Sequence, residues 1–245
     1  MTLLTLDLAL ELARRYCAER YPEGSALLAG SIVRGMATPT SDLDIVLLFD
    51  RLDQAWRETT SINGVTTELF AHDPATLGWF LELDAKGGRA PLARMIADGI
   101  PVSGPAPRIE TAKARAAAWL AAGPPPLDLH AIEDRRYIVT DLAEDLRGGG
   151  TPGEIIAIAA RLHDVLAELV LRTAGHWSGT GKELARGLEA LNPDLALRFE
   201  HAFGALFRHG HAAQLLGLVE ELLAPLGGPA AAGYRREAPP GWRRE

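Results

Sequence analysis

The first hundred residues alternate short apolar runs with amphipathic segments. The opening segment MTLLTLDLALELARRY places Asp7 and Glu11 among leucines and alanines, which predicts an amphipathic helix packed on a sheet and not a signal peptide. Apolar runs predict strands at 26–28, 43–49, 65–71 and 100–102. Helices are predicted at 74–83 and 92–98. Residues 1–107 are therefore expected to form an α/β unit with a small mixed sheet.

From Glu110 onward the pattern becomes helical and rich in alanine and leucine. Breaks rich in glycine and proline divide this region, and helices are predicted between them at 131–147, 154–173, 181–190, 193–208 and 211–224. Such helices are expected to pack as an all-α bundle, so residues 108–227 are the second predicted domain. Residues 228–245 are rich in glycine, proline and arginine, which predicts a flexible tail.

Two aspartates, Asp42 and Asp44, lie two residues apart at the start of the apolar run 43–49. In a strand their side chains leave the same face, roughly 7 Å apart along the backbone. Like charges this close on a largely apolar strand repel one another and resist desolvation. A hard divalent cation such as Mg²⁺, which takes oxygen ligands and is completed by substrate phosphates, removes the conflict. The pair therefore predicts half of a metal site.

Gly30 and Ser31 follow the first apolar run and open an expected short helix at 32–36. A Gly-Ser turn offers backbone N–H groups and a hydroxyl to an anion. Taken singly, these residues and the two aspartates also fit ordinary roles as a turn glycine, a helix cap and exposed carboxylates on an edge strand. Taken together, they predict a nucleoside-triphosphate site with phosphate on one side and metal on the other.

This constellation resembles the signature of the nucleotidyltransferase superfamily of DNA polymerase β type. That signature joins a hydrophobic residue, Gly, and Gly or Ser to an acid-hydrophobic-acid strand after a short gap, here Ala29-Gly30-Ser31 and Asp42-Leu43-Asp44. The longer string GSIVRGMATPTSDLDIVL, which includes Arg34 and Ser41, is similar to the subgroup of aminoglycoside and other small-molecule nucleotidyltransferases. The resemblance implies an α/β catalytic domain, a triphosphate substrate, expected to be ATP, and Mg²⁺.

The superfamily also uses a third carboxylate from a neighbouring strand. Glu68 lies in the middle of the predicted strand GVTTELFA, and Asp73 lies just beyond its end. Glu68 is preferred because a residue within a strand is held more rigidly than one in a turn before proline. Asp42, Asp44 and Glu68 are therefore the predicted metal ligands and catalytic acids.

Further roles follow from the resemblance of the second region to the helical domain of the same subgroup. In that subgroup a base for the incoming hydroxyl can come from the helical domain, and Asp141 and Asp145 are the first candidates, although a solvated acidic helix face is the favoured interpretation of either residue taken singly. Lys182, after the turn Gly179-Thr180-Gly181, would bind phosphate or lie in solvent. Arg34 would bind the triphosphate or pair with a carboxylate at the edge of the site. Gly30, Ser31, Arg34, Ser41 and Lys182 are the predicted phosphate-binding set.

The formal net charge of −7 bears on the partner. Proteins that bind nucleic acid present a basic surface, whereas the dense basic clusters here are confined to Arg235-Arg236 and Arg243-Arg244, so nucleic acid is disfavoured. An acidic cleft would suit a cationic small molecule. The single cysteine, Cys17, excludes an intrachain disulfide and fits a core thiol in a reducing compartment. We expect no membrane span and a cytoplasmic location.

The predicted function is transfer of a nucleoside monophosphate, AMP from ATP, to a hydroxyl of a small-molecule acceptor, with an aminoglycoside-like antibiotic as one option. Two alternatives stay open. The acceptor would be a protein or RNA, as in nucleotidyltransferase-like toxins and antitoxins, or the chain would be a nucleotide-binding regulator without catalysis. A monomer and a homodimer are both compatible with the sequence.

Overall fold

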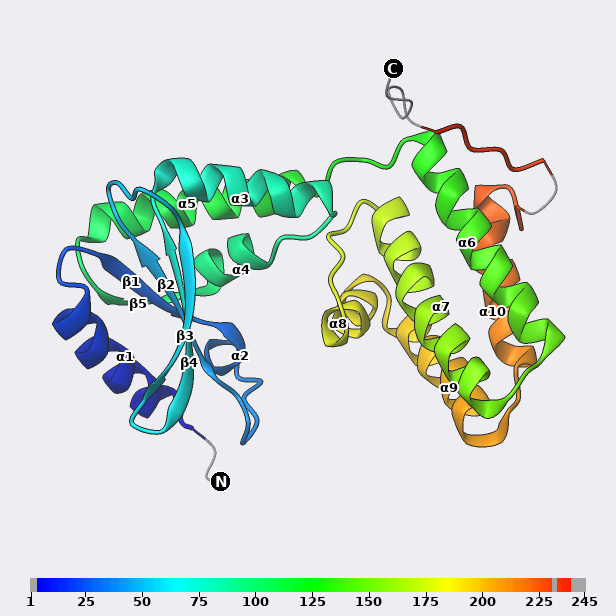
Figure 1. Ribbon diagram of the computed structural model, residues 1–245, viewed down its shortest axis with the longest axis horizontal. Coiled ribbons are helices and arrows are strands. Elements are labelled where there is room, and N and C mark those ends of the chain that lie inside the picture. The colour runs from blue at the N-terminus through cyan, green and yellow to red at the C-terminus, as the bar shows by residue number, and fades with distance from the viewer. Residues whose placement is uncertain (1–3, 231–232, 239–245) are drawn as a thin grey trace, which may run out of the picture. The chain divides into compact units, whose positions relative to one another are not determined.

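The computed structural model describes residues 4–230 and 233–238. Their contacts divide the chain into two compact units, the first ending at Pro124 and the second beginning at Pro125 (Figure 1). The first unit is α/β with a five-stranded mixed sheet and the second is helical, which confirms the predicted fold class. The expected boundary at residue 107 falls within α5 (Ala106–Ala122), which packs against α4 and β1 in the first unit.

The sheet has the strand order β3-β4-β2-β1-β5. Its strands are β1 (Ser25–Ala29), β2 (Leu43–Leu48), β3 (Trp56–Ile62), β4 (Val65–His72) and β5 (Ile100–Ser103). β2 and β4 run parallel, and the other neighbouring pairs are antiparallel. All of β1 is buried, and Asp44 is the one residue of β2 that is not. A carboxylate therefore stands in the most buried part of the sheet.

Helices pack on both faces of this sheet. On one face lies α1 (Leu6–Arg20), whose apolar stripe of Ala9, Leu12, Ala13 and Cys17 is buried against the strands. Burial raises the pKa of the Cys17 thiol to about 12, as expected for a core thiol and not for a nucleophile. The other face carries α3 (Pro74–Lys86) and α5, with α4 (Pro91–Asp98) packed against both of them.

The sequence predictions missed the edge strand β3. Its residues, WRETTSI, are mostly polar and exposed, because one edge of this strand and much of its surface meet solvent. It pairs with β4 along its whole length, with Arg57 opposite Phe70 and Thr59 opposite Glu68. This strand brings Arg57 to the candidate site.

The second unit consists of helices connected by short turns. They are α6 (Leu129–Gly148), α7 (Pro152–Thr173), α8 (Lys182–Leu191), α9 (Pro193–His209), α10 (Ala213–Leu223) and the 3₁₀ turn η1 (Ala224–Leu226). Their apolar stripes meet in one core that includes Leu162, Leu166, Phe199, Phe203 and Leu215. The predicted helices at 131–147, 154–173, 181–190, 193–208 and 211–224 match them closely.

The segment after Gly227 makes contacts with α6 where the structure describes it. Tyr234 stacks on Tyr137 with ring centroids 4.1 Å apart, and its hydroxyl donates to Asp134 over 2.8 Å. Within the expected flexible tail, residues 231–232 and 239–245 lie outside the described residues.

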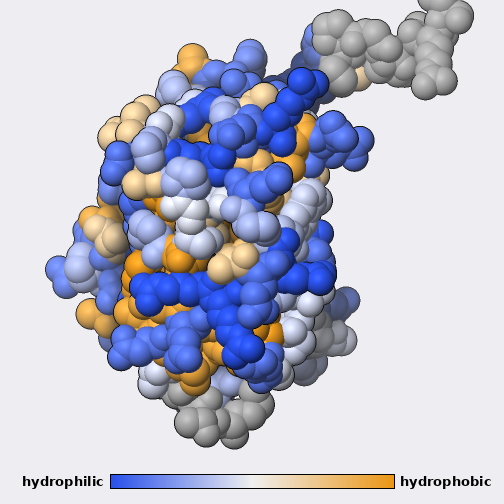
Figure 2. Space-filling view, turned by 90° about the vertical axis from the view of Figure 1, so that its left-hand side faces the viewer, coloured by the Kyte–Doolittle hydropathy of each residue, from blue (hydrophilic) through white to orange (hydrophobic). Residues whose placement is uncertain are grey.

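Hydrophilic side chains cover much of the side of the molecule shown in Figure 2, with hydrophobic ones in small groups between them. None of the helices in the described ranges has the length and apolar character needed to cross a membrane.

Candidate active site

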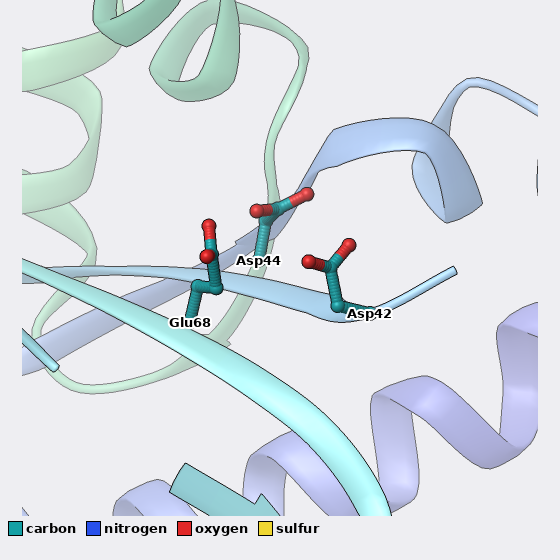
Figure 3. A group of neighbouring side chains, drawn as sticks. All are labelled: Asp42, Asp44 and Glu68. Atoms are coloured by element: carbon teal, nitrogen blue, oxygen red, sulfur yellow. The ribbon is translucent and has the colours of Figure 1, made fainter. Parts of the chain in front are cut away.

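Three carboxylates converge on one face of the sheet. Asp42 and Asp44 lie at the start of β2, and Glu68 is the residue of β4 paired with Asp44. One oxygen from each carboxylate lies within 4.8 Å of the others, and Figure 3 shows the three groups projecting to the same side of the two strands. The parallel register explains this meeting, since paired residues on adjacent strands point the same way. We call Asp42, Asp44 and Glu68 the acidic triad.

The Gly-Ser turn belongs to the same site. Ala29 pairs with Asp44 across β1 and β2, so the chain leaving β1 passes directly beside the Asp44 carboxylate. Gly30 begins the short helix α2 (Gly30–Val33) with φ of +79°, and a Cβ atom at Gly30 would lie 1.8 Å from Oδ2 of Asp44. Both the backbone conformation and the close approach require glycine. The backbone of the Gly-Ser turn therefore lies directly against the acidic triad.

Hydroxyl groups tie the loop before β2 to this turn. The Ser31 hydroxyl donates to Oγ of Ser41 over 3.1 Å, and the N–H of Thr38 donates to the same Ser41 oxygen over 2.9 Å. The N–H of Met36 donates to the carbonyl of Ser31 over 2.9 Å. Ser41 thus holds Ser31 in place beside the triad, while direct contact of either residue with phosphate stays a prediction.

The electrostatics of the triad favour a cation. The pKa of Asp44 is raised to about 6, first by burial and then by the negative charges of Asp42 and Glu68. The positive charges of Arg34 and Arg57 lower it only in part. A carboxylate whose pKa is raised by neighbouring negative charges gains from a bound cation, and an all-oxygen donor set suits a hard divalent ion. The residues present therefore fit the divalent metal that the sequence predicts.

Arg57 is a site residue that the sequence interpretation did not include. Its Nη2 lies 2.6 Å from Oε1 of Glu68, and its guanidinium lies 5.1 Å from the centroid of the Phe70 ring. The missed strand β3 carries it, and the signal for that strand is the dipeptide Asn63-Gly64. Both residues have positive φ, as a tight hairpin turn requires.

Asp73, the rival third carboxylate, has a different role. It caps α3, accepting hydrogen bonds from the N–H of Thr76 over 2.8 Å and of Leu52 over 2.9 Å. These hydrogen bonds, led by that of Thr76, lower the pKa of Asp73 to about 2. It follows the far end of β4, so the structure brings Glu68, and not Asp73, to Asp42 and Asp44.

The remaining predicted residues lie in the second unit. Asp141 and Asp145 are exposed and one turn apart on α6, and Lys182 is the exposed first residue of α8. The acidic triad, Gly30, Ser31, Arg34 and Ser41 all belong to the first unit. A base role for the two aspartates and a phosphate role for Lys182 stay predictions.

Comparison with known proteins bears on this geometry. The family model of the nucleotidyltransferase domain matches residues 10–82, which include most of α1, the Gly-Ser turn and the whole acidic triad. This segment is a nucleotidyltransferase domain. The superfamily and the enzyme class predicted from the sequence, a nucleotidyltransferase, are thereby confirmed.

Other comparisons add less. A solved structure of a nucleotidyltransferase-like protein from Exiguobacterium sibiricum 255-15 is similar at 12% identity and a TM-score of 0.44, covering 88% of this chain and 74% of that one. No curated protein matches the chain.

Proposed function

We propose that this nucleotidyltransferase transfers a nucleoside monophosphate, AMP from ATP, to a hydroxyl group of a small molecule in a Mg²⁺-dependent reaction. The acceptor oxygen forms a bond to the α-phosphorus, the bond from that phosphorus to the bridging oxygen of the β-phosphate breaks, and pyrophosphate leaves. The hydroxyl proton passes to a base or to water. The observation that carries the proposal is the acidic triad, with three carboxylate oxygens within 4.8 Å beside a Gly-Ser turn.

The residues of the first unit have distinct parts in this reaction. Asp42, Asp44 and Glu68 would hold the metal, which when bound neutralises charge on the phosphates. The N–H groups at the start of α2 and the Ser31 hydroxyl would hold the triphosphate, as helix N-termini hold anions. Arg34, whose positive charge lowers the pKa of Asp44, would partly neutralise the negative charge of the triphosphate.

The second unit would supply the remaining groups. Asp141 or Asp145 would accept the hydroxyl proton, and Lys182 would contact phosphate. Because positioning and charge stabilisation supply most of the rate in phosphoryl transfer, loss of the base is expected to slow the reaction without abolishing it. We also place the protein in the cytoplasm, on the single cysteine.

Pyrophosphate release tests the proposal. Each of the four ribonucleoside triphosphates is incubated with Mg²⁺ and a panel of hydroxyl compounds that includes aminoglycosides, with the double variant Asp42→Asn/Asp44→Asn as the blank. Release above the blank with one compound supports the proposal. A protein or RNA that becomes labelled during incubation with radiolabelled triphosphate would show that the acceptor is a macromolecule. Triphosphate binding without pyrophosphate release in any mixture would favour a regulator without catalysis.

A further inference from the structure

A pocket lies beside the acidic triad on the same face of the sheet. It is enclosed by β3, β4, α3 and α4 and has a volume of about 320 Å³. We call it the β4 pocket, and its principal lining residues are Trp56, Arg57, Phe70, His72, Phe80, Asp84 and Met95. Glu68, Phe70 and His72 alternate along β4 and so share one face, with Phe70 roughly 7 Å from Glu68 along the strand. The pocket therefore begins next to the third carboxylate of the triad.

The walls of the β4 pocket are apolar and incompletely covered. Phe70, Phe80 and Met95 are half-buried although each has a large apolar side chain. The Phe80 ring stands edge-on to His72, with centroids 5.1 Å apart, which fixes two of the walls. Aromatic walls of this kind suit a flat ring, and the volume is at the lower end of the range for small-molecule sites.

His72 adds a neutral ring to these walls. Its side chain is 5% exposed, and its Nδ1 atom is buried without a hydrogen-bond partner among the described residues. Burial also lowers the pKa of His72, so the ring is neutral at pH 7. Because the Nδ1 atom is closed to solvent, it offers no hydrogen bond to a ligand, and His72 contributes a neutral ring to the wall of the pocket.

Arg57 sets the charge at the side of the pocket nearest the triad. It lines the pocket, contacts Glu68 and lies over the Phe70 ring. Glu68 pairs with the positive charge of Arg57, and the carboxyl of Asp84, whose pKa burial raises, lines the pocket on α3, so the pocket favours an uncharged ligand over a charged one. This differs from what the net charge of −7 of the whole chain favours, because only the charges at the site act at short range.

The sheet order places the β4 pocket opposite the phosphate cradle. The order β3-β4-β2-β1 puts the Gly-Ser turn after β1 on one flank of the triad, and Arg57 and Phe70 on the other. In phosphoryl transfer the attacking and leaving oxygens lie roughly in line on opposite sides of the phosphorus. A triphosphate held at the Gly-Ser turn therefore leaves the β4 side for the attacking hydroxyl.

We propose that the β4 pocket binds the acceptor, and that the acceptor is an uncharged alcohol with a flat, mainly apolar ring. The proposal rests on the proposed function for the word acceptor, but the pocket's ligand class is independent of turnover. It also narrows the acceptor, since polycationic aminoglycosides have no such ring.

Ligand-observed NMR tests this without catalysis. The probe is 2-(2-naphthyl)ethanol, measured by saturation transfer on the wild type and on Asp42→Asn/Asp44→Asn, with myo-inositol and kanamycin as non-aromatic probes. We expect the naphthyl alcohol to bind both proteins and the other two to bind about tenfold more weakly or not at all. Equal binding of kanamycin or inositol, or no binding of the naphthyl alcohol, would overturn the proposal.

Two pocket-filling variants and one matched control locate the binding. Met95→Trp and Ala55→Phe place larger side chains at positions lining the pocket, whereas Leu83→Trp adds the same ring at an exposed position of α3. Naphthyl alcohol affinity should fall about tenfold in whichever filling variant melts as a folded protein, and stay unchanged in Leu83→Trp. Unchanged affinity in a folded filling variant would overturn the assignment.

A last arm separates the two substrates. ATP with Ca²⁺ in place of Mg²⁺ is added to the wild type with the naphthyl alcohol bound. Both should bind together; displacement of the alcohol by ATP would assign the pocket to the nucleobase and overturn the acceptor proposal. Failure of pyrophosphate release with an intact probe site would count against the proposed function alone.

Discussion

Two groups of carboxylates along the same pair of parallel strands show opposite electrostatics. The acidic triad stands at the start of β2 and the middle of β4, and there the pKa of Asp44 is raised to about 6. Asp50 and Asp73 follow the far ends of these strands. Hydrogen bonds from Thr76 and Leu52 lower the pKa of Asp73 to about 2, and a hydrogen bond from Arg108 lowers that of Asp50.

The difference separates a candidate binding site from a structural contact. Asp73 and Asp50 have their charges satisfied by donors of the fold itself, so they need nothing further. The triad carries charge that the fold only partly compensates, an arrangement that persists where a ligand supplies the compensation. A carboxylate's environment, and not its residue type, therefore distinguishes Asp44 from Asp73.

The largest expected difference between the two groups is in activity. Asp44→Asn should lower nucleotidyl transfer about 10²- to 10³-fold, because it removes charge at the point where phosphate charge must be neutralised. Asp73→Asn, the same change at the far end of the strands, should leave the rate close to that of the wild type. Initial rates of pyrophosphate release measure both. Equal losses in the two variants would contradict the separation.

Replacing Asp44 should raise the stability of the metal-free protein, whereas replacing Asp73 should lower it. A carboxyl with a higher pKa in the folded protein than its ordinary 3.8 destabilises the fold when ionised, so this penalty is full above pH 6 and disappears as pH falls from about 6 to 3.8. Asp44→Asn should therefore stabilise the protein by about 1 to 3 kcal/mol at pH 8, measured by urea unfolding in EDTA. Added Mg²⁺ should stabilise the wild type and not the variant.

A loss of stability in Asp44→Asn under these conditions would show that the carboxylate is compensated within the fold. Urea unfolding of both proteins at pH 5 is the matched reference, because their free energies of unfolding should differ less there than at pH 8.

A substitution of Arg57 tests how its positive charge, which partly offsets the negative charge of the triad, affects metal binding. Arg57→Met removes the contact with Glu68, and loss of a group that orients a metal-ligating carboxylate weakens metal binding about tenfold or more. Mn²⁺ titration followed by the EPR signal of free Mn²⁺ measures this directly. Arg57→Lys should recover part of the affinity, and Arg51→Met, at an exposed arginine beyond β2, should leave it unchanged. Tighter binding in Arg57→Met would mean that Arg57 competes with the metal.

Most of the triad could be predicted from the sequence, because two of its three residues lie close together in the chain. Asp42 and Asp44 fall two apart in an apolar run, and Gly30-Ser31 precedes them after a short gap, so strand periodicity alone orients them. Glu68 required a comparison between a strand position and a turn position, which favoured the residue that the structure brings to Asp42 and Asp44. The apolar runs and glycine breaks likewise located the helices of the second unit, since each buries a continuous stripe.

What the sequence did not contain depended on pairing between strands. Arg57 lies in a polar edge strand without an apolar run, and its contact with Glu68 follows from the register of β3 on β4. The closeness of Gly30 to Asp44 and the enclosure of the β4 pocket also come from register and helix packing. Such contacts join residues whose relation is set by the whole fold and by no local pattern.

The smallest expected effect concerns the satisfied group itself. Asp73→Ala should destabilise the protein by about 1 to 2 kcal/mol, because it removes the cap of α3 and leaves the N–H of Leu52 without its acceptor. A carboxyl whose pKa is lowered to about 2 stabilises the fold above pH 3.8 and loses that contribution as pH falls from 3.8 to 2. The difference between wild type and Asp73→Ala should therefore shrink through this window. Urea unfolding at pH 7 and pH 3 measures it, with Asp53→Ala, at an exposed aspartate next to Leu52 in the loop between β2 and β3, as the control. A difference that grows towards pH 3 would mean that the Asp73 carboxylate, like the triad, carries uncompensated charge.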